Sequence, residues 1–145
     1  MRVLIDADGC PVIDETVGHS LKNNIECLIL CDTFHHIEKK DARTIICSKG
    51  PDSVDFTLVN HLRAGDIVVT QDYGLAAMCL SRGAAVLDQN GMEYTQENID
   101  FLLFSRHTGQ KLRRMGKRTK GPKKRTQEQN DVFCDKLQQI LARKE

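Results

Sequence analysis

Two stretches of this sequence place aspartates where several carboxylates can act together. Asp6 and Asp8 follow the apolar run Val3-Leu4-Ile5, and Asp72 follows the apolar run 67–70. Each run is typical of a buried strand, so these acids stand at strand ends, where sites form in parallel α/β sheets. Carboxylates gathered in one crevice repel one another, and they either raise their pKa values or recruit a cation. Oxygen ligands favour Mg²⁺ or Mn²⁺.

A third acidic position comes from residues 52–62, which are predicted to form a helix. On a helical wheel of about 100° per residue, Asp55 falls inside the apolar arc between Val54 and Val59. An aspartate there is costly unless a cation or hydrogen bonds compensate it. We therefore predict one metal-binding and catalytic site made of four residues, namely Asp6, Asp8, Asp55 and Asp72. Such a site can hold one or two ions and activate water for attack on a phosphodiester.

Charge divides the chain into three parts. Residues 1–105 carry eight basic and sixteen acidic residues, residues 106–125 carry ten basic residues and no acid, and residues 126–145 carry three basic and four acidic residues. A basic arm adds sequence-independent affinity for nucleic acid and offsets the repulsion from an acidic pocket. A solvated loop is the alternative interpretation. The expected nucleic-acid contacts are Arg106, Lys111, Arg113, Arg114, Lys117, Arg118, Lys120, Lys123, Lys124 and Arg125.

Cysteine usage and hydropathy bear on the compartment. The six cysteines form no C-x-x-C pair, which favours buried free thiols in a reducing cytosol. No apolar run approaches the roughly 18 residues of a membrane span, and Asp6 comes too early for a signal peptide. We expect a cytoplasmic protein whose partner is RNA or another phosphodiester and not a membrane; a homodimer is left open.

The elements that would position these residues alternate between strand and helix. Strands are predicted at 3–5, 25–30, 44–47, 67–70 and 85–87, and helices from about 11, 52, 73, 95 and 126. Apolar strands that do not alternate in polarity predict a doubly wound, mainly parallel α/β sheet with helices on both faces. We expect residues 1–105 to form this domain, residues 106–125 a largely irregular basic arm, and residues 126–145 a helix that packs on the same domain.

Helix starts offer two further predictions. Pro11 is placed as the first residue of the first helix, and Asp8 could cap that helix instead of serving the site. Thr126 and Gln129 are spaced as a capping box for the last helix.

The segments 3–12 and 65–76 resemble the YaiI/YqxD-like bacterial proteins, an uncharacterised family. Gly121-Pro122 followed by Phe133 matches as well, so the resemblance covers nearly the whole chain. Its most specific part is the opening D-A-D-x-C-P, residues 6–11. The family is similar in fold to the PIN-domain nucleases, which bind Mg²⁺ or Mn²⁺ through a set of acids and cleave RNA.

The resemblance assigns a role to each acid in turn. Asp6 matches the acid after the first PIN strand, Asp55 resembles the central helical acid, and Asp72 resembles the acid after the fourth strand. Asp8 can serve as the fourth acid, although its closeness to Asp6 departs from the usual spacing. The resemblance therefore implies a PIN-like, Mg²⁺- or Mn²⁺-dependent nuclease.

Two other functions fit part of the sequence. An apolar run followed by Asp6-x-Asp8-Gly9 also resembles the first motif of haloacid-dehalogenase phosphatases, in which Asp6 would be the nucleophile. Asp66 with Asp72 mimics their later acidic motif, and Lys49 is the only nearby lysine. The second alternative is an RNA-binding module without catalysis, which the basic arm fits equally well.

Three other features could do chemistry but have simpler interpretations. Cys10 is expected to be a small buried residue beneath the Asp6 turn. His35-His36 could bind a metal or phosphate, and a surface loop is the favoured interpretation. Tyr73 could stack on a base or pack in the core, and the sequence does not choose.

Overall fold

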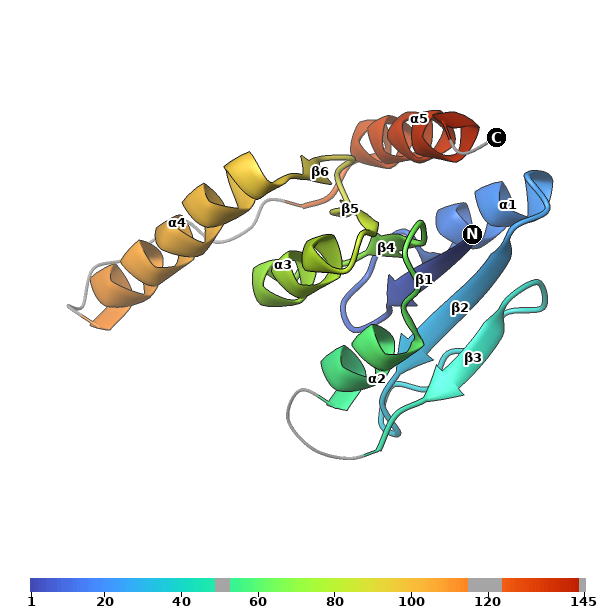
Figure 1. Cartoon of the computed structure of the whole chain (residues 1–145), viewed down its shortest axis with the longest axis horizontal. Coiled ribbons are helices and arrows are strands. Elements are labelled where there is room, and N and C mark those ends of the chain that lie inside the picture. Colours follow the sequence, from blue (N-terminus) through green and yellow to red (C-terminus); the bar gives the residue numbers. More distant parts are fainter. Residues whose placement is uncertain (49–52, 115–123, 144–145) are drawn as a thin grey trace.

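A computed structural model describes residues 1–48, 53–114 and 124–143, with only the backbone described for 106–114. Its sheet has six strands in the order β3-β2-β1-β4-β5-β6 (Figure 1). The strands are β1 (Arg2–Asp6), β2 (Glu26–Cys31), β3 (Arg43–Ile46), β4 (Ile67–Val69), β5 (Ala85–Leu87) and β6 (Glu93–Tyr94). Every neighbouring pair is parallel except β5 and β6. The predicted mainly parallel sheet is confirmed, and the two-residue β6 is an addition to it.

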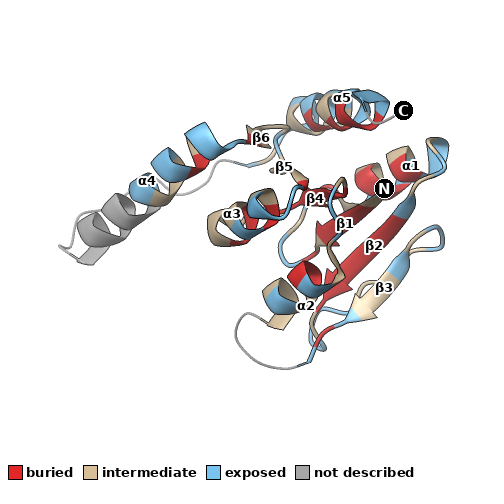
Figure 2. Ribbon diagram, viewed as in Figure 1, coloured by how far each residue is buried: buried red, intermediate tan, exposed pale blue. Residues whose placement is uncertain are grey.

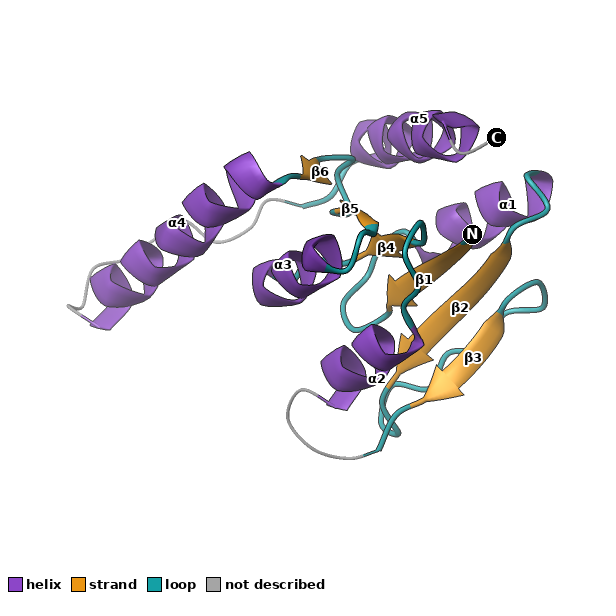
Figure 3. Ribbon diagram, viewed as in Figure 1, coloured by secondary structure: helices purple, strands orange, loops and turns teal. Residues whose placement is uncertain are grey.

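Helices cover both faces of this sheet (Figure 3). They are α1 (Ile13–Lys22), α2 (Ser53–His61), α3 (Tyr73–Ser81), α4 (Gln96–Arg114) and α5 (Gln127–Arg143). Helices α1 and α5 pack on the face that carries Val3 and Ile5 of β1. Helices α2, α3 and the start of α4 pack on the face that carries Leu4.

Burial on both faces explains the apolar runs of the central strands (Figure 2). Val3, Leu4 and Ile5 are fully buried, as are Ile67 and Val68. Successive side chains of a strand point to opposite faces, so a strand covered on both sides needs apolar residues at every position. The strand order reverses between β1 and β4, and this switch point is where α/β sheets open a crevice.

The predicted helix starts have mixed outcomes. Helix α1 begins at Ile13 with Val12 as its N-cap and no capping side chain, so the predictions that Pro11 begins it and that Asp8 caps it are wrong. The capping box of α5 is confirmed: the backbone N–H of Thr126 donates to Gln129 Oε1 at 2.9 Å, and the Gln129 N–H donates to Thr126 Oγ1 at 3.3 Å.

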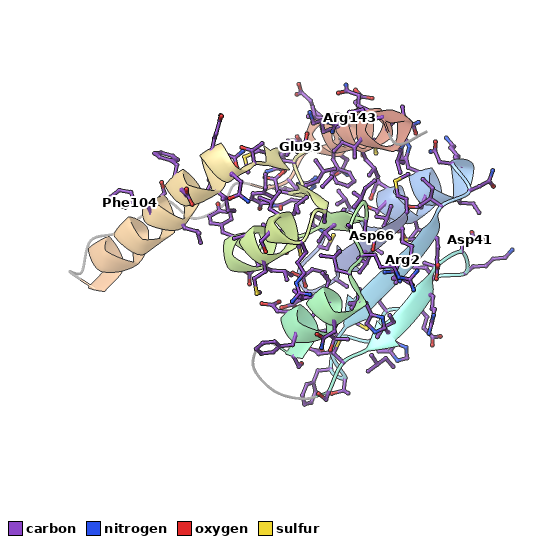
Figure 4. All side chains as sticks on the ribbon, in the orientation of Figure 1. Arg2, Asp41, Asp66, Glu93, Phe104 and Arg143 are labelled. Atoms are coloured by element: carbon purple, nitrogen blue, oxygen red, sulfur yellow. The ribbon has the colours of Figure 1, made fainter. Side chains whose placement is uncertain are left out.

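Helix α4 is longer than predicted. It continues to Arg114, into the segment 106–125 that was expected to be largely irregular, so that expectation is wrong for 106–114. Its second half extends past the edge of the sheet (Figure 1), and the side chain of Phe104, near the middle of the helix, is exposed (Figure 4). Within the residues described, no helix combines the length and apolar character that would let it cross a membrane.

The turn after β5 packs tightly against α5. Gly91 has a φ of +85°, and a Cβ there would lie 3.0 Å from the carbonyl oxygen of Val132 and 3.2 Å from Cα of Phe133. Glycine meets both requirements because it tolerates positive φ and lacks a Cβ. This close approach brings α5 onto the sheet beside α1.

Candidate active site

A pocket of about 580 Å³ opens at the carboxyl edge of the sheet, beside the switch point between β1 and β4. All four aspartates that the sequence singled out line it, and they come from three separate segments of the chain. They are Asp6, Asp8, Asp55 and Asp72. Asp32, Gln71 and Tyr73 also contribute to its wall. The structure therefore brings the four predicted residues to one place.

Thr70 joins the ends of β1 and β4. It is 2% exposed, and its Oγ1 donates to Asp6 Oδ2 at 2.7 Å while accepting from the backbone N–H of Asp72 at 3.0 Å. The parallel register, in which Ile5 pairs with Val69, sets Thr70 beside Asp6. Sequence reasoning passed over Thr70, although its place directly after a strand and two residues before Asp72 was a usable signal.

Asp72 is both a pocket residue and a helix cap. Its Oδ1 accepts from the Leu75 N–H at 3.1 Å, which satisfies one of the donors at the start of α3. The neighbouring Gln71 donates through Nε2 to the Gly9 carbonyl oxygen at 2.6 Å. This bond ties the loop after β4 to the turn after β1, so two walls of the pocket are fixed together.

Burial and like charges act on the Asp6 carboxyl. Burial raises its pKa, the charges of Asp72 and Asp8 raise it further, and the hydrogen bond from Thr70 opposes the rise. A carboxylate in this position is stabilised by any cation that enters the pocket. Burial also raises the pKa of the half-buried Cys10 to about 11. Its thiol is therefore protonated at neutral pH and a poor nucleophile, in line with the simpler interpretation.

The donor set has the right chemistry for Mg²⁺ or Mn²⁺, because the four predicted side chains offer carboxylate oxygens. Within the described residues, however, no three Asp, Glu, His or Cys side chains form a group that could hold a metal ion. The four carboxylates surround the pocket without converging on one point. An ion there would need other oxygen atoms, such as those of a phosphate, or a change of side-chain conformation.

Asp32 is the pocket residue that sequence reasoning missed. It directly follows β2, just as Asp72 closely follows β4, but the strand was predicted to end before Cys31. Its Oδ1 accepts from the backbone N–H groups of Phe34 and His35 at 2.9 and 2.7 Å. Nδ1 of His35 lies 2.9 Å from Oδ1 and 3.1 Å from Oδ2. Residues 33–36 are exposed, which confirms the surface loop.

Two other strand-flanking acids lie outside the pocket lining. Asp66, 2% exposed, precedes β4 and forms an ion pair with Arg2 at 3.0 Å (Figure 4). It therefore stands at the amino edge, opposite Asp6 and Asp72, and cannot share their site as the phosphatase comparison required. Asp88 follows β5, but its Oδ1 accepts from the N–H groups of Asn90 and Met92, both at 2.8 Å. Lys49, the lysine that the phosphatase comparison offered, lies outside the described residues.

Tyr73 packs and lines the pocket at once. Its ring meets that of Tyr94 edge-on, with centroids 6.1 Å apart at 65°. The Tyr94 hydroxyl donates to the Thr70 carbonyl oxygen at 3.3 Å. The aromatic pair thus supports the strand end that carries Thr70.

The ten basic residues of 106–125 fall into three groups. Arg106, Lys111, Arg113 and Arg114 belong to α4, with backbone alone described, and Lys117, Arg118, Lys120 and Lys123 lie outside the described residues. Lys124 is exposed.

Arg125 joins the start of α5 to the turn after β5. Its guanidinium donates to Asn130 Oδ1 at 2.6 Å, to Asn90 Oδ1 at 2.7 Å and to the Gln89 carbonyl oxygen. Its place is thus structural, whatever it contributes to binding.

Comparison with known proteins gives the family. A family model described as "Uncharacterized BCR, YaiI/YqxD family" matches residues 4–143. The UPF0178 protein of Exiguobacterium sibiricum is 51% identical over 144 residues, which cover 99% of each chain. The UPF0178 proteins of Ruminiclostridium cellulolyticum and Natranaerobius thermophilus are 48% and 41% identical, over 92% and 98% of this chain and 87% and 97% of theirs. No solved structure matches the chain. The chain therefore belongs to the YaiI/YqxD family of bacterial proteins.

Proposed function

We propose that this protein is a PIN-like nuclease that uses Mg²⁺ or Mn²⁺ to hydrolyse phosphodiester bonds in RNA or a related substrate. One observation carries the proposal: aspartates from the end of β1, from α2 and from the start of α3 line a single pocket. Negative charges that the fold gathers from distant parts of the chain destabilise it unless a cation balances them. Burial and like charges both act on Asp6, and a carboxylate under such strain in a pocket is a candidate for function.

Asp6 and Asp72 would hold the ion from the edge that Thr70 braces, with Asp8 and Asp55 on the other walls of the pocket. The bound ion would neutralise these carboxylates and polarise the phosphodiester. The raised pKa of Asp6 supports this proposal because burial, and then the charges of Asp72 and Asp8, disfavour the ionised form of a carboxylate that a bound cation would stabilise. Phosphate oxygens of the substrate would complete a coordination sphere that the side chains leave open.

The basic segment supplies the attraction that the acidic body lacks. Residues 1–105 carry a net charge of −8, whereas residues 106–125 carry +10. We expect the basic residues to contact the phosphate backbone, which positions a strand without reading its sequence. The substrate is thus drawn to the protein by one part of the chain and cleaved by another.

Two other functions stay open to the same assays. A phosphatase with Asp6 as nucleophile is less well supported, because Asp66 lies at the opposite edge of the sheet, bound to Arg2. A non-catalytic RNA-binding module would use the basic segment alone. That function would give no role to the aspartates that line the pocket.

The first experiment is calorimetric titration of Mn²⁺ into wild type and into the double variant Asp6→Asn, Asp72→Asn. We expect saturable binding to wild type and none to the double variant. Asp100→Asn, an exposed acid of α4, is the matched control and should bind like wild type. A wild type that binds no Mn²⁺, with or without RNA, would contradict the proposal.

The second experiment compares substrates in the presence of Mn²⁺. A nuclease cleaves end-labelled RNA and bis(4-nitrophenyl) phosphate, and both activities should disappear in the double variant. A phosphatase instead hydrolyses 4-nitrophenyl phosphate and acquires a phosphoryl group on Asp6. A binding module cleaves none of them, and its RNA affinity shows a salt dependence that weakens when basic residues of 106–125 are removed.

A further inference from the structure

His35 is fixed beside the candidate site by a residue of the pocket wall. Asp32 lines the pocket, and its carboxylate lies 2.9 and 3.1 Å from Nδ1 of His35. The same carboxylate accepts from the backbone N–H groups of Phe34 and His35, which folds the loop back onto the end of β2. The imidazole is therefore held against a residue of the pocket wall, Asp32, through both its ring and its backbone.

The Asp32 carboxylate fixes which nitrogen of the His35 ring faces it as a hydrogen-bond donor. Partial burial acts to raise the pKa of Asp32, but hydrogen bonds from His35 and Phe34 outweigh it and lower that pKa. An ionised carboxylate only accepts hydrogen bonds, so Nδ1 is the ring nitrogen that donates to Asp32, and Nε2 is the nitrogen left to accept a proton. A carboxylate that orients a histidine in this way is the arrangement by which hydrolases position a general base.

The pocket itself does not offer a suitable base. Its ionisable lining residues, among those described, are five aspartates and Tyr73. Aspartates that bind an ion have their lone pairs engaged in holding it, and the Tyr73 ring packs edge-on against Tyr94. His35 is 62% exposed, so water can reach its ring next to this wall.

We propose that His35 is the general base of the hydrolysis and that Asp32 is its positioning residue; this inference rests on the proposed function. Nε2 of His35 accepts a proton from a water molecule as the water oxygen bonds to phosphorus. The bond between phosphorus and the leaving ester oxygen breaks with its electron pair on that oxygen. The leaving oxygen then takes a proton from bulk water, and Nε2 returns its proton to bulk water.

The test is hydrolysis of bis(4-nitrophenyl) phosphate by wild type and His35→Ala, each with Mn²⁺. This probe has a leaving group that needs no protonation, so it isolates activation of the attacking water. We expect kcat of His35→Ala to fall by about 10²–10⁴-fold with little change in KM, and added imidazole to restore part of the rate. Asp32→Asn keeps the ring but loses the ionised partner, and should lower kcat while KM is kept.

The matched control is His36→Ala, in the same loop. His36 pairs instead with Glu38, at 3.1 Å, and both side chains are exposed. It should hydrolyse the probe at the wild-type rate, and circular dichroism should show that all variants fold.

The outcomes separate this inference from the proposed function. If His35→Ala is as active as wild type, or if its loss is not restored by imidazole, the assignment of His35 is overturned. The nuclease proposal then still stands, provided that the double variant Asp6→Asn, Asp72→Asn is inactive. If wild type does not hydrolyse the diester at all, both are overturned.

Discussion

Replacing Thr70 by valine removes the one hydroxyl that links the carboxylate of Asp6 to the backbone of Asp72. Valine has nearly the same shape, so the substitution changes hydrogen bonding far more than packing. Thr70→Ser is the matched control, because it keeps the hydroxyl and loses only a methyl group. The comparison asks whether the two strand ends are held together by this hydroxyl.

The expected loss of stability follows from the two hydrogen bonds of the Thr70 hydroxyl. A hydrogen bond to a charged group stabilises a fold by about 1.5–3 kcal/mol, and a buried N–H left without a partner costs about 1–3 kcal/mol. Valine recovers about 1 kcal/mol by burying an additional methyl group. We therefore expect Thr70→Val to lower the free energy of unfolding by about 2–4 kcal/mol, and Thr70→Ser by about 1 kcal/mol.

The loss of stability in Thr70→Val should also depend on pH. The Thr70 bond lowers the pKa of Asp6, and the valine variant lets that pKa rise further above the ordinary value of 3.8. As pH rises, the unfolded chain releases this proton first, so stability falls until the folded pKa is passed. The deficit of Thr70→Val is therefore smaller in acid and complete at neutral pH.

Urea unfolding followed by circular dichroism, with a chelator present, measures both effects. A valine variant within about 1 kcal/mol of wild type at neutral pH would refute the reasoning, given the bond energies involved. So would a serine variant as unstable as the valine variant, or a deficit that does not change with pH.

Three other predictions concern stability. Without metal, wild-type stability should fall as pH rises from 3.8 through the raised folded pKa of Asp6; Asp6→Asn should abolish this fall and raise Tm at neutral pH, measured by thermal melting. Gly91→Ala should cost about 2 kcal/mol or more, because its positive φ and its contact with α5 both exclude a Cβ, whereas Gly18→Ala, in open space on α1, should add about 0.5–1 kcal/mol. Arg125→Gln should cost about 1–2 kcal/mol in urea unfolding through its lost hydrogen bonds, and Lys124→Gln should cost nothing measurable.

Hydrophobic pattern predicted most of the sheet. Runs such as Val3-Leu4-Ile5 are apolar at every position because both faces are covered, and that pattern separates a buried parallel strand from a half-exposed one. Strand β6 could not be predicted, because two residues, Glu93–Tyr94, are too few to show the alternating polarity of a strand. The sequence does not predict the end of α4, because Gly109 within the basic segment favours irregular backbone and yet lies inside the helix. A single glycine costs a helix only about 1 kcal/mol, and the Lys, Arg, Gln and Leu residues around it are good helix formers.

The aspartates of the site could be predicted from the sequence, whereas the contacts that hold them could not. Asp6 and Asp72 could be placed by strand ends, and Asp55 by its position on the apolar face of a helix. Asp32 was not predicted as a site residue, because the strand before it was expected to end at residue 30, whereas β2 ends at Cys31. The Thr70 bond depends on the pairing of β1 with β4, which are 60 residues apart, and no local pattern reports such a register.

The way in which each aspartate is held separates structural acids from candidate site acids. Asp66 is bound by the guanidinium of Arg2 and by two backbone N–H groups, so its charge is cancelled where it stands. Asp6 is oriented by a neutral donor, the Thr70 hydroxyl, which fixes the carboxylate without neutralising it. A fold that needed this acid only for stability would gain more from a cationic partner than from a hydroxyl. Because Asp6 is held in place by a neutral group, its charge stays available for a cation that enters the pocket.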